Sequence, residues 1–191
     1  MPSGSARGKL IVISAPSGSG KTTIAREIIR LNPFVRFSIS ATTRPKRQGE
    51  LEGKDYYFLT KEEFRRRVDA GEFVEWEELY ENYYGTPKSE LHAAVREGRH
   101  VLFDVDVKGG LSIKGEYPET LMIFIRTPDV ATLRERLIRR ETESKEMLQK
   151  RMERVPMELL LGSRYEHQIV NDQLQRTASE VQAIVRAFLE Q

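Results

Sequence analysis

Eight consecutive residues near the N-terminus combine glycine, lysine and hydroxyl side chains in a spacing suited to binding phosphate. They fit the pattern G-x-x-x-x-G-K-[ST] except at the first position, where alanine replaces glycine. Glycines let backbone N–H groups converge on an anion, the lysine adds a positive charge, and the last hydroxyl can ligate Mg²⁺. We therefore predict a site for the phosphates of a nucleotide rather than a simple helix-capping turn. Its residues are Ala15, Pro16, Ser17, Gly18, Ser19, Gly20, Lys21 and Thr22.

Two aspartates lie farther along the chain, at the end of a predicted strand. Asp104 and Asp106 follow the apolar residues 101–103. A carboxylate that ends a parallel strand beside a phosphate loop can hold Mg²⁺ directly or through water. On spacing alone, the same two residues could instead cap the next helix. With the phosphate loop nearby, we expect Thr22 and Asp104 to be the Mg²⁺ ligands.

Three further clusters could bind a second anion or a transferring phosphoryl group. Residues 42–47 form a basic loop rich in hydroxyls, and residues 82–86 (Asn-Tyr-Tyr-Gly-Thr) form a turn with aromatic and hydroxyl groups. Arginines between residues 134 and 154 could cancel charge on a phosphoryl group in transfer. Taken alone, each cluster could equally be packing or a solvated run of charges. The arginines are Arg136, Arg139, Arg140 and Arg151.

The phosphate loop requires a strand before it and a helix after it, and the sequence pattern supplies both. The apolar run 10–13 predicts a buried parallel strand, and the helical spacing of 22–31 predicts a helix that Asn32-Pro33 ends. This alternation recurs, with strands predicted at 101–107, 121–125 and 169–170 and helices at 107–114, 129–139 and 177–189. The order predicts an α/β fold with a mostly parallel sheet.

Two stretches depart from this alternation. Residues 37–96 contain several tyrosines and short alternating segments, such as 56–59 and 73–77, which predict a small mixed or antiparallel insertion. Residues 134–154 are densely charged, with a helical pattern and few apolar positions. A helix that is polar nearly all round is usually solvent-bridging or mobile. We therefore expect this second stretch to be a flap rather than part of the core.

The composition argues against several other classes of protein. The 191 residues include no cysteine, which excludes disulfides, thiolate catalysis and Cys-zinc sites, and the three histidines lack metal-ligand spacing. A net charge of +2 is too small to imply nucleic-acid binding by itself. The apolar runs are too short to span a bilayer, and the N-terminus has no signal-peptide core. We expect a cytoplasmic protein with no nucleic-acid or membrane partner.

Taken together, the motifs resemble those of the guanylate kinase family, whose members phosphorylate GMP with ATP. Matching segments cover nearly the whole chain. Thr-Thr-Arg and Tyr-Tyr-Gly-Thr are much more specific than a phosphate loop, which many families share. The segments are 15–22, 40–47, 53–56, 71–76, 82–86, 104–106 and 169–172, together with the arginines of the flap.

The resemblance implies an architecture of three parts. The core, at 1–37, 98–128 and 155–191, would be a P-loop NTPase domain with three α/β/α layers around a parallel sheet. An inserted mixed α/β domain at 38–97 would bind GMP. A small helical lid, residues 129–154, would close over ATP. Ala15 and the lid segment 139–142, which lacks a glycine often found there, depart from the family pattern.

The resemblance also implies roles for individual residues. The GMP phosphate would be held by Arg44, Arg47, Tyr56 and Tyr84, and the guanine would face Ser40, Glu75 and Thr86, with Asp106 near its amino edge. Asn171 and Asp172 would lie beside the adenine of ATP. The residues implied in catalysis are Lys21, Arg44, Arg136, Arg140 and Arg151, acting with Mg²⁺.

The chemistry of the substrates agrees with these roles. A carboxylate such as Glu75 only accepts hydrogen bonds, which suits the N–H donors of guanine and leaves adenine without a match. The acceptor phosphate is largely ionised at neutral pH, so no general base is needed. Catalysis then consists of positioning two anions in line and cancelling their repulsion.

Two other functions are compatible with parts of this pattern. The first is a kinase for another phosphorylated acceptor, such as a different nucleoside monophosphate or a ribose bisphosphate, which would not need the guanine residues. The second is an inactive domain that binds phosphopeptides, which would typically lack the phosphate-loop lysine and the lid arginines. Because this chain has both, we expect an enzyme that converts ATP and GMP to ADP and GDP.

Overall fold

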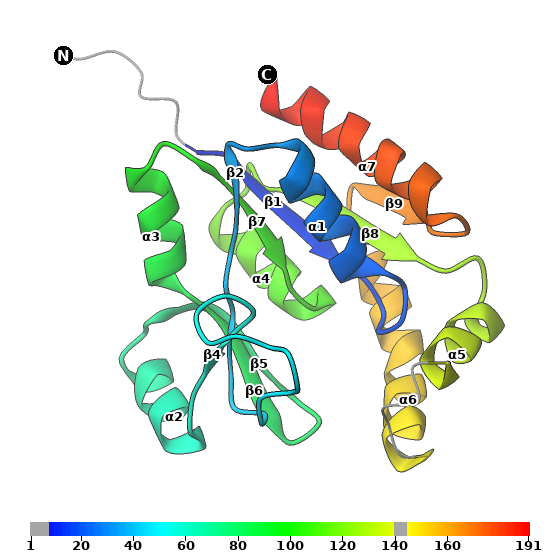
Figure 1. Ribbon diagram of the computed structural model, residues 1–191, viewed down its shortest axis with the longest axis horizontal. Helices are drawn as coiled ribbons and strands as arrows, with labels where there is room; N and C mark the ends of the chain where they lie inside the picture. The colour runs from blue at the N-terminus through cyan, green and yellow to red at the C-terminus, as the bar shows by residue number, and fades with distance from the viewer. Residues whose placement is uncertain (1–7, 140–144) are drawn as a thin grey trace.

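A parallel sheet lies at the centre of the computed structural model, which describes residues 8–139 and 145–191 (Figure 1). Its strand order is β2-β7-β1-β8-β9, and every neighbouring pair runs parallel. All five residues of the central strand β1 are buried, as expected for a strand covered on both faces. The strands are β1 (Leu10–Ser14), β2 (Val35–Phe37), β7 (His100–Asp104), β8 (Leu121–Arg126) and β9 (His167–Val170).

Helices cover both faces of this sheet, which gives the expected three layers. On one face, Ile11 and Ile13 pack with α1 (Lys21–Leu31) and α7 (Leu174–Leu189). On the other face, Val12 packs with residues of α3 (Lys88–Arg96), α4 (Val107–Glu116) and the C-terminal part of α6 (Lys145–Gly162). Alternate residues of β1 therefore serve opposite cores, and the prediction of a three-layer α/β fold is confirmed.

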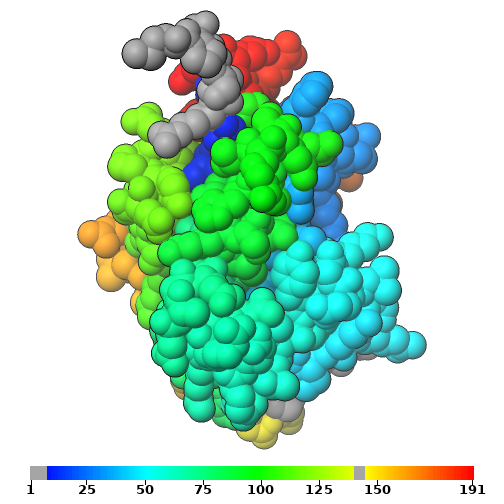
Figure 2. Space-filling model, turned by 90° about the vertical axis from the view of Figure 1, so that its left-hand side faces the viewer, coloured from blue at the N-terminus to red at the C-terminus, as the bar shows by residue number. Residues whose placement is uncertain are grey.

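The insertion forms a second, four-stranded sheet of order β4-β3-β6-β5. β3 and β4 are parallel and the other pairs are antiparallel, so the predicted mixed character is confirmed. Helix α2 (Lys61–Asp69) places the fully buried Phe64 against this sheet. In Figure 2 the insertion, coloured cyan to blue-green, forms the lower part of the molecule. Its strands are β3 (Ala41–Thr42), β4 (Tyr57–Phe58), β5 (Phe73–Leu79) and β6 (Asn82–Pro87).

Helix α5 (Val130–Ile138) and the first part of α6 lie to the other side, at the lower right of Figure 1. The two helices pack through Leu133, Leu137 and Val155, so this charged stretch has an apolar seam and is not polar all round. α6 continues through Pro156 to Gly162, across the boundary expected between lid and core.

The observed elements differ from the predicted ones in two further places. The short strand β2 was not predicted, because it has only three residues and Arg36 interrupts its apolar pattern. β7 ends at Asp104 rather than at 107, so that Val105 and Asp106 form the turn into α4. No helix in the part of the chain that the structure describes is long and apolar enough to cross a membrane.

Candidate active site

A cavity of about 260 Å³ lies where the phosphate loop, the second sheet and α6 meet. The residues that line it come from positions 15 to 158, so distant parts of the sequence are brought together. The residues from the sequence prediction that line it are Ala15, Pro16, Ser17, Gly18, Gly20, Lys21, Thr22, Ser40, Arg44, Arg47, Tyr56, Glu75, Tyr84, Asp104, Asp106 and Arg151.

The phosphate loop has the backbone that its glycines allow. Gly18 and Gly20 have φ values of 93° and 89°, in the left-handed region that favours glycine. A Cβ on Gly20 would lie 2.6 Å from the side-chain nitrogen of Asn171, so alanine would be strained by this φ and would displace that amide. Ala15 has no positive φ, and its departure from the glycine pattern therefore introduces no backbone strain.

Lys21 and Thr22, at the start of α1, both contact Asp104 at the end of β7. The Lys21 ammonium lies 2.6 Å from one carboxylate oxygen, and the Thr22 hydroxyl donates to the other at 2.9 Å. Burial lowers the pKa of Lys21, but the charge and hydrogen bond of Asp104 outweigh it, so the net pKa is raised. The Lys21 side chain therefore stays protonated beside the phosphate loop.

The same three residues allow a test of whether Mg²⁺ would fit. A hydroxyl and a carboxylate are oxygen ligands of the kind that Mg²⁺ prefers, and Mg²⁺ usually adds substrate phosphates and water rather than a full protein cage. The described residues contain no cluster of three or more His, Asp or Glu side chains able to hold a metal alone. The donor set at Thr22 and Asp104 thus fits a Mg²⁺ ion bound with a nucleotide.

Asp106 serves as the N-cap of α4, accepting a hydrogen bond from the backbone N–H of Gly109 at 2.8 Å. The helix-capping alternative for the two aspartates thus applies to Asp106 but not to Asp104. The second carboxylate oxygen of Asp106 lies 3.4 Å from the Arg154 guanidinium and lines the cavity.

Glu75 and Thr86 form a buried pair across the antiparallel strands β5 and β6. The fully buried Thr86 hydroxyl donates to the Glu75 carboxylate at 2.6 Å. Burial raises the pKa of Glu75 to about 7, with the nearby carboxylates of Asp106 and Glu77 acting in the same direction and Thr86 opposing them. Burial removes water from the ionised carboxylate and so costs free energy. N–H donors from a ligand would offset this cost by hydrogen-bonding to the carboxylate oxygens.

Arg44 is a buried cation with a protein partner already in place. Its guanidinium makes two hydrogen bonds to Glu50, at 2.7 and 2.5 Å, and lies over the Tyr56 ring at 4.8 Å. The hydrogen bonds from Arg44 lower the pKa of Glu50 to about 2. This bidentate pair fixes the guanidinium plane beside Tyr56 and Tyr84, which pack edge to face.

The arginines of the stretch expected to form a lid differ in what they contact. Arg151 on α6 hydrogen-bonds the Ser17 hydroxyl of the phosphate loop. Arg136 on α5 donates to the backbone carbonyl of Asn171 at 3.0 Å and is not among the lining residues described for the cavity. The predicted catalytic residue Arg140 lies outside the described residues.

The two residues expected beside adenine occupy different environments. The side chain of Asn171 is buried and donates to the backbone carbonyl of Ser19 at 2.7 Å, so it braces the phosphate loop. Asp172 is exposed and pairs with Arg176 at 2.6 Å. Neither is among the residues described as lining the cavity.

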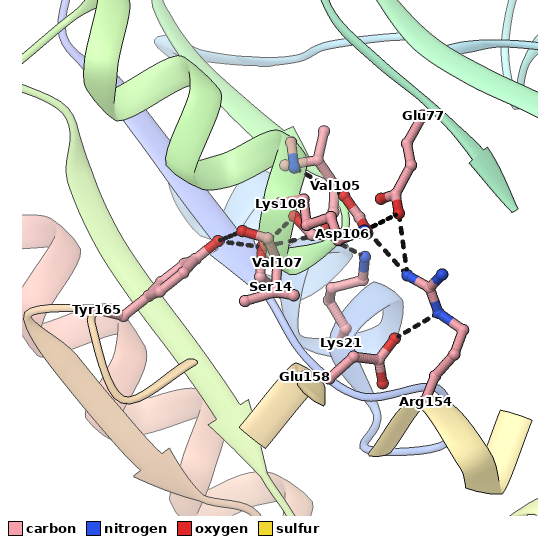
Figure 3. A network of polar contacts seen from close by, with 11 residues as sticks. Ser14, Lys21, Glu77, Val105, Asp106, Val107, Lys108, Arg154, Glu158 and Tyr165 are labelled. Atoms are coloured by element: carbon pink, nitrogen blue, oxygen red, sulfur yellow. Dashed lines mark hydrogen bonds and ion pairs between the residues drawn. The ribbon is translucent and has the colours of Figure 1, made fainter. Parts of the chain in front are cut away.

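A polar network that the sequence analysis missed lies on the α6 side of the cavity (Figure 3). The Arg154 guanidinium lies 3.3 Å from Glu77 on β5, 3.4 Å from Asp106 and 3.5 Å from Glu158. Burial and the neighbouring Asp106 carboxylate raise the pKa of Glu77, against the effect of Arg154. The i, i+4 spacing of Arg154 and Glu158 was the only signal in the sequence, and many solvent-exposed helices share it.

These features define a class of protein. A parallel α/β/α sheet carries a phosphate loop after its central strand, an aspartate ends the adjacent strand, and arginines border the same cavity. That combination is typical of the P-loop enzymes that bind nucleotides and transfer phosphoryl groups.

Comparisons with known proteins narrow the class to one family. The guanylate kinase family model matches residues 7–188. The chain is 44% identical to a guanylate kinase of Symbiobacterium thermophilum, over 95% of this chain and 86% of the relative, and 42% identical to one of Thermotoga maritima, over 95% and 87%. The crystal structure of guanylate kinase from Anaplasma phagocytophilum superposes with a TM-score of 0.76 at 32% identity, covering 95% of this chain and 86% of that one. The chain belongs to the guanylate kinase family.

Proposed function

We infer that this chain catalyses transfer of the γ-phosphoryl group of ATP to GMP, giving ADP and GDP. The observation that carries this function is a single cavity lined both by Lys21 of the phosphate loop and by Glu75 of the second sheet, whose carboxylate accepts a hydrogen bond from the buried Thr86. The first feature suits a nucleoside triphosphate, and the second suits a base with adjacent N–H donors.

Glu75 and its neighbours account for the choice of guanine. Guanine presents N–H donors at N1 and N2, whereas adenine presents a bare acceptor at N1. Adenine would offer the ionised Glu75 carboxylate no N–H donor beside the hydroxyl of Thr86, and polar mismatches of this kind reduce specificity constants by ~10⁴-fold or more. Ser40 and Asp106 line the same cavity and would complete the contacts to the base.

Arg44, Arg47, Tyr56 and Tyr84 would hold the phosphate of GMP. Arg44 is aligned by Glu50, so less side-chain entropy is lost when it binds an anion. The Tyr56 side chain is partly buried, and burial raises the pKa of its hydroxyl, which keeps it a neutral donor. Arg47 is exposed at the rim of the cavity and would add charge from the solvent side.

Lys21, Arg151, Arg136 and Arg140 would cancel charge on the phosphates of ATP during transfer. The backbone N–H groups of the phosphate loop and the N-terminus of α1 would position the β- and γ-phosphates. A Mg²⁺ ion held by Thr22 and Asp104 would supply further charge neutralisation at the phosphate oxygens. Asn171 and Asp172 would border the adenine.

A coupled assay of ADP release, with ATP, Mg²⁺ and a panel of acceptors, tests this function. The acceptors are GMP, AMP, CMP, UMP and ribose 1,5-bisphosphate. We expect rapid turnover with GMP alone. Turnover with another acceptor would overturn the guanine assignment, and a folded protein that binds ATP but turns over none of them would overturn the enzymatic function.

A further inference from the structure

The turn between β5 and β6 has an unusual sequence for its backbone. Leu79 pairs with Asn82, which leaves Tyr80 and Glu81 as a two-residue loop, and their φ values are 52° and 67°. Two-residue loops with positive φ at both positions favour Asn-Gly or Asp-Gly, because most other residues are strained there. Tyr80 and Glu81 are the only non-glycine residues with positive φ among those that the structure describes.

Both side chains of this strained turn contact one face of α6. The Arg151 and Arg154 guanidinium carbons lie 5.3 and 5.8 Å from the centre of the Tyr80 ring. The Lys150 ammonium lies 3.0 Å from the Glu81 carboxylate. A cation over an aromatic face within about 6 Å is attracted to it, whereas the exposed Lys150–Glu81 pair contributes little. The Tyr80 ring is therefore the main contact.

One of the cations that Tyr80 contacts is also at the phosphate loop. Arg151 hydrogen-bonds Ser17, while Arg154 reaches back to Glu77 on the same strand that carries Glu75. Tyr80 thus lies between the sheet expected to hold the acceptor and the arginine expected at the donor phosphates. Strained backbone is concentrated at functional sites, so the strain in a turn between these two parts of the cavity indicates a functional role for its side chains.

We propose that the Tyr80-Glu81 turn, chiefly through the Tyr80 ring, holds α6 against the second sheet and so keeps Arg151 over the phosphate loop. The turn links the two substrate sites, since it belongs to the acceptor sheet and orients a donor-site arginine. The proposal rests on the proposed function for the assignment of Arg151 to the ATP phosphates.

The test replaces Tyr80 and Glu81 together by Asn and Gly. Because Asn-Gly is the favoured sequence for this turn, the variant should unfold at the same temperature as the wild type or a higher one. We expect its kcat at saturating ATP and GMP to fall about tenfold. Hydrogen exchange should become faster in residues 145–158 but not in β6. Tyr80→Phe, which keeps the ring over both arginines, should retain wild-type kcat and exchange.

A double-mutant cycle with Arg151→Ala tests whether the turn affects kcat through Arg151. If the turn acts through Arg151, the Asn-Gly replacement should not lower kcat further when Arg151 is already absent. An equal fold-loss in both backgrounds would overturn the proposal, as would unchanged kcat and exchange in the Asn-Gly variant. If the wild type failed to phosphorylate GMP, the proposed function would fall, and the exchange measurement alone would still decide whether the turn holds α6.

Discussion

Lys21, at the start of α1, is partly buried and Glu75, on β5, is buried, and each ionisable side chain is held by a partner that a substrate would have to share. Lys21 is paired with Asp104, and Glu75 accepts a hydrogen bond from Thr86. Burying a charge costs free energy unless a partner compensates it. Removing each charged group from water therefore costs free energy in the free protein. A bound phosphate would offset this cost at Lys21, and a bound guanine would offset it at Glu75.

Replacing Lys21 by Ala tests the donor side at the scale of one residue. The Nζ group would be lost from the phosphate loop, while Thr22 would still donate to Asp104 and the helix would gain a residue of high propensity. We expect kcat to fall by at least about 10²-fold, as for other losses of a preorganised charge contact in a transition state. Steady-state kinetics measure this loss, and unchanged circular dichroism shows that the fold remains. Retention of wild-type turnover in the folded variant would contradict the assignment.

Replacing Glu75 by Gln tests the acceptor side. The amide keeps one acceptor but turns a donor toward the base, so the preference for GMP over AMP in kcat/KM should fall by about 10²-fold or more. Glu78→Gln is the matched control, because Glu78 lies on the same strand and is exposed. It should keep the wild-type preference. An unchanged preference in the Glu75 variant would mean that guanine is recognised elsewhere.

The raised pKa of Glu75 predicts a dependence of GMP affinity on pH. Its pKa is about 7 in the folded protein against 4.5 for an ordinary glutamate, so the folded state holds this proton more tightly, and the contribution of Glu75 to the free energy of unfolding falls as pH rises through that interval. Guanine N–H donors favour the ionised carboxylate. GMP binding should therefore release a proton below about pH 7, and its Kd should decrease as pH rises toward that value.

Calorimetric titration in buffers of different ionisation enthalpy measures this proton release. The GMP phosphate also titrates, near pH 6, and contributes to the pH dependence of any variant. Glu75→Gln keeps the phosphate contribution and should lose the remainder. Identical pH profiles of Kd for the wild type and the variant would show that Glu75 does not change its protonation on binding.

At the scale of secondary structure, the first turn of α4 packs directly against Glu75, the residue proposed to bind the acceptor base. A Cβ on Gly109 would contact the Glu75 carboxylate and would lie 3.1 Å from an Asp106 carboxylate oxygen. Gly115, on the same helix, has no atom within 4 Å of the corresponding position. The two glycines thus differ in what surrounds them, while both gain helix propensity on replacement by alanine.

Gly109→Ala should displace Glu75 and raise the KM for GMP about tenfold, with the KM for ATP within about twofold of the wild type. Gly115→Ala should leave both constants unchanged and raise the free energy of unfolding by about 0.5–1 kcal/mol. Kinetics and chemical denaturation of the pair measure these effects. If Gly109→Ala behaved like Gly115→Ala, the close packing of α4 on Glu75 would not matter for binding.

The secondary structure also shows which features of the fold follow from local sequence. β1, the phosphate loop and α1 were predicted because an apolar run, a glycine motif and a helical spacing follow one another. β2 was missed because three residues are too few for a periodic signal. The Tyr80-Glu81 turn contradicts the local rule for its backbone, and both of its side chains contact α6, which no pattern within the turn predicts.

At the scale of the whole molecule, the candidate site is formed by three parts of the chain rather than by one. Lys21 and Glu75 could be proposed as site residues from the sequence because short segments that contain them carry the family resemblance, and both line the cavity. The Arg154 network could not, since Glu77, Asp106 and Arg154 are far apart in sequence and meet only in the folded chain. Contacts of this kind, between segments distant in sequence, depend on packing that no single segment encodes.

The shared cavity predicts that one molecule can occupy both substrate sites. Adenosine and guanosine joined through a polyphosphate chain would reach the phosphate loop and Glu75 together, and linking the two halves raises the effective concentration of each. At 100 times its Kd, such a ligand stabilises a protein by about 2.7 kcal/mol, which should raise Tm by about 5–10 °C in a chain of this size. ATP and GMP, added together at the same concentration, should raise Tm less. Thermal unfolding measures the difference, and Lys21→Ala and Glu75→Gln should each reduce the shift. A shift no larger than that of the separate nucleotides would mean that the two sites are not continuous.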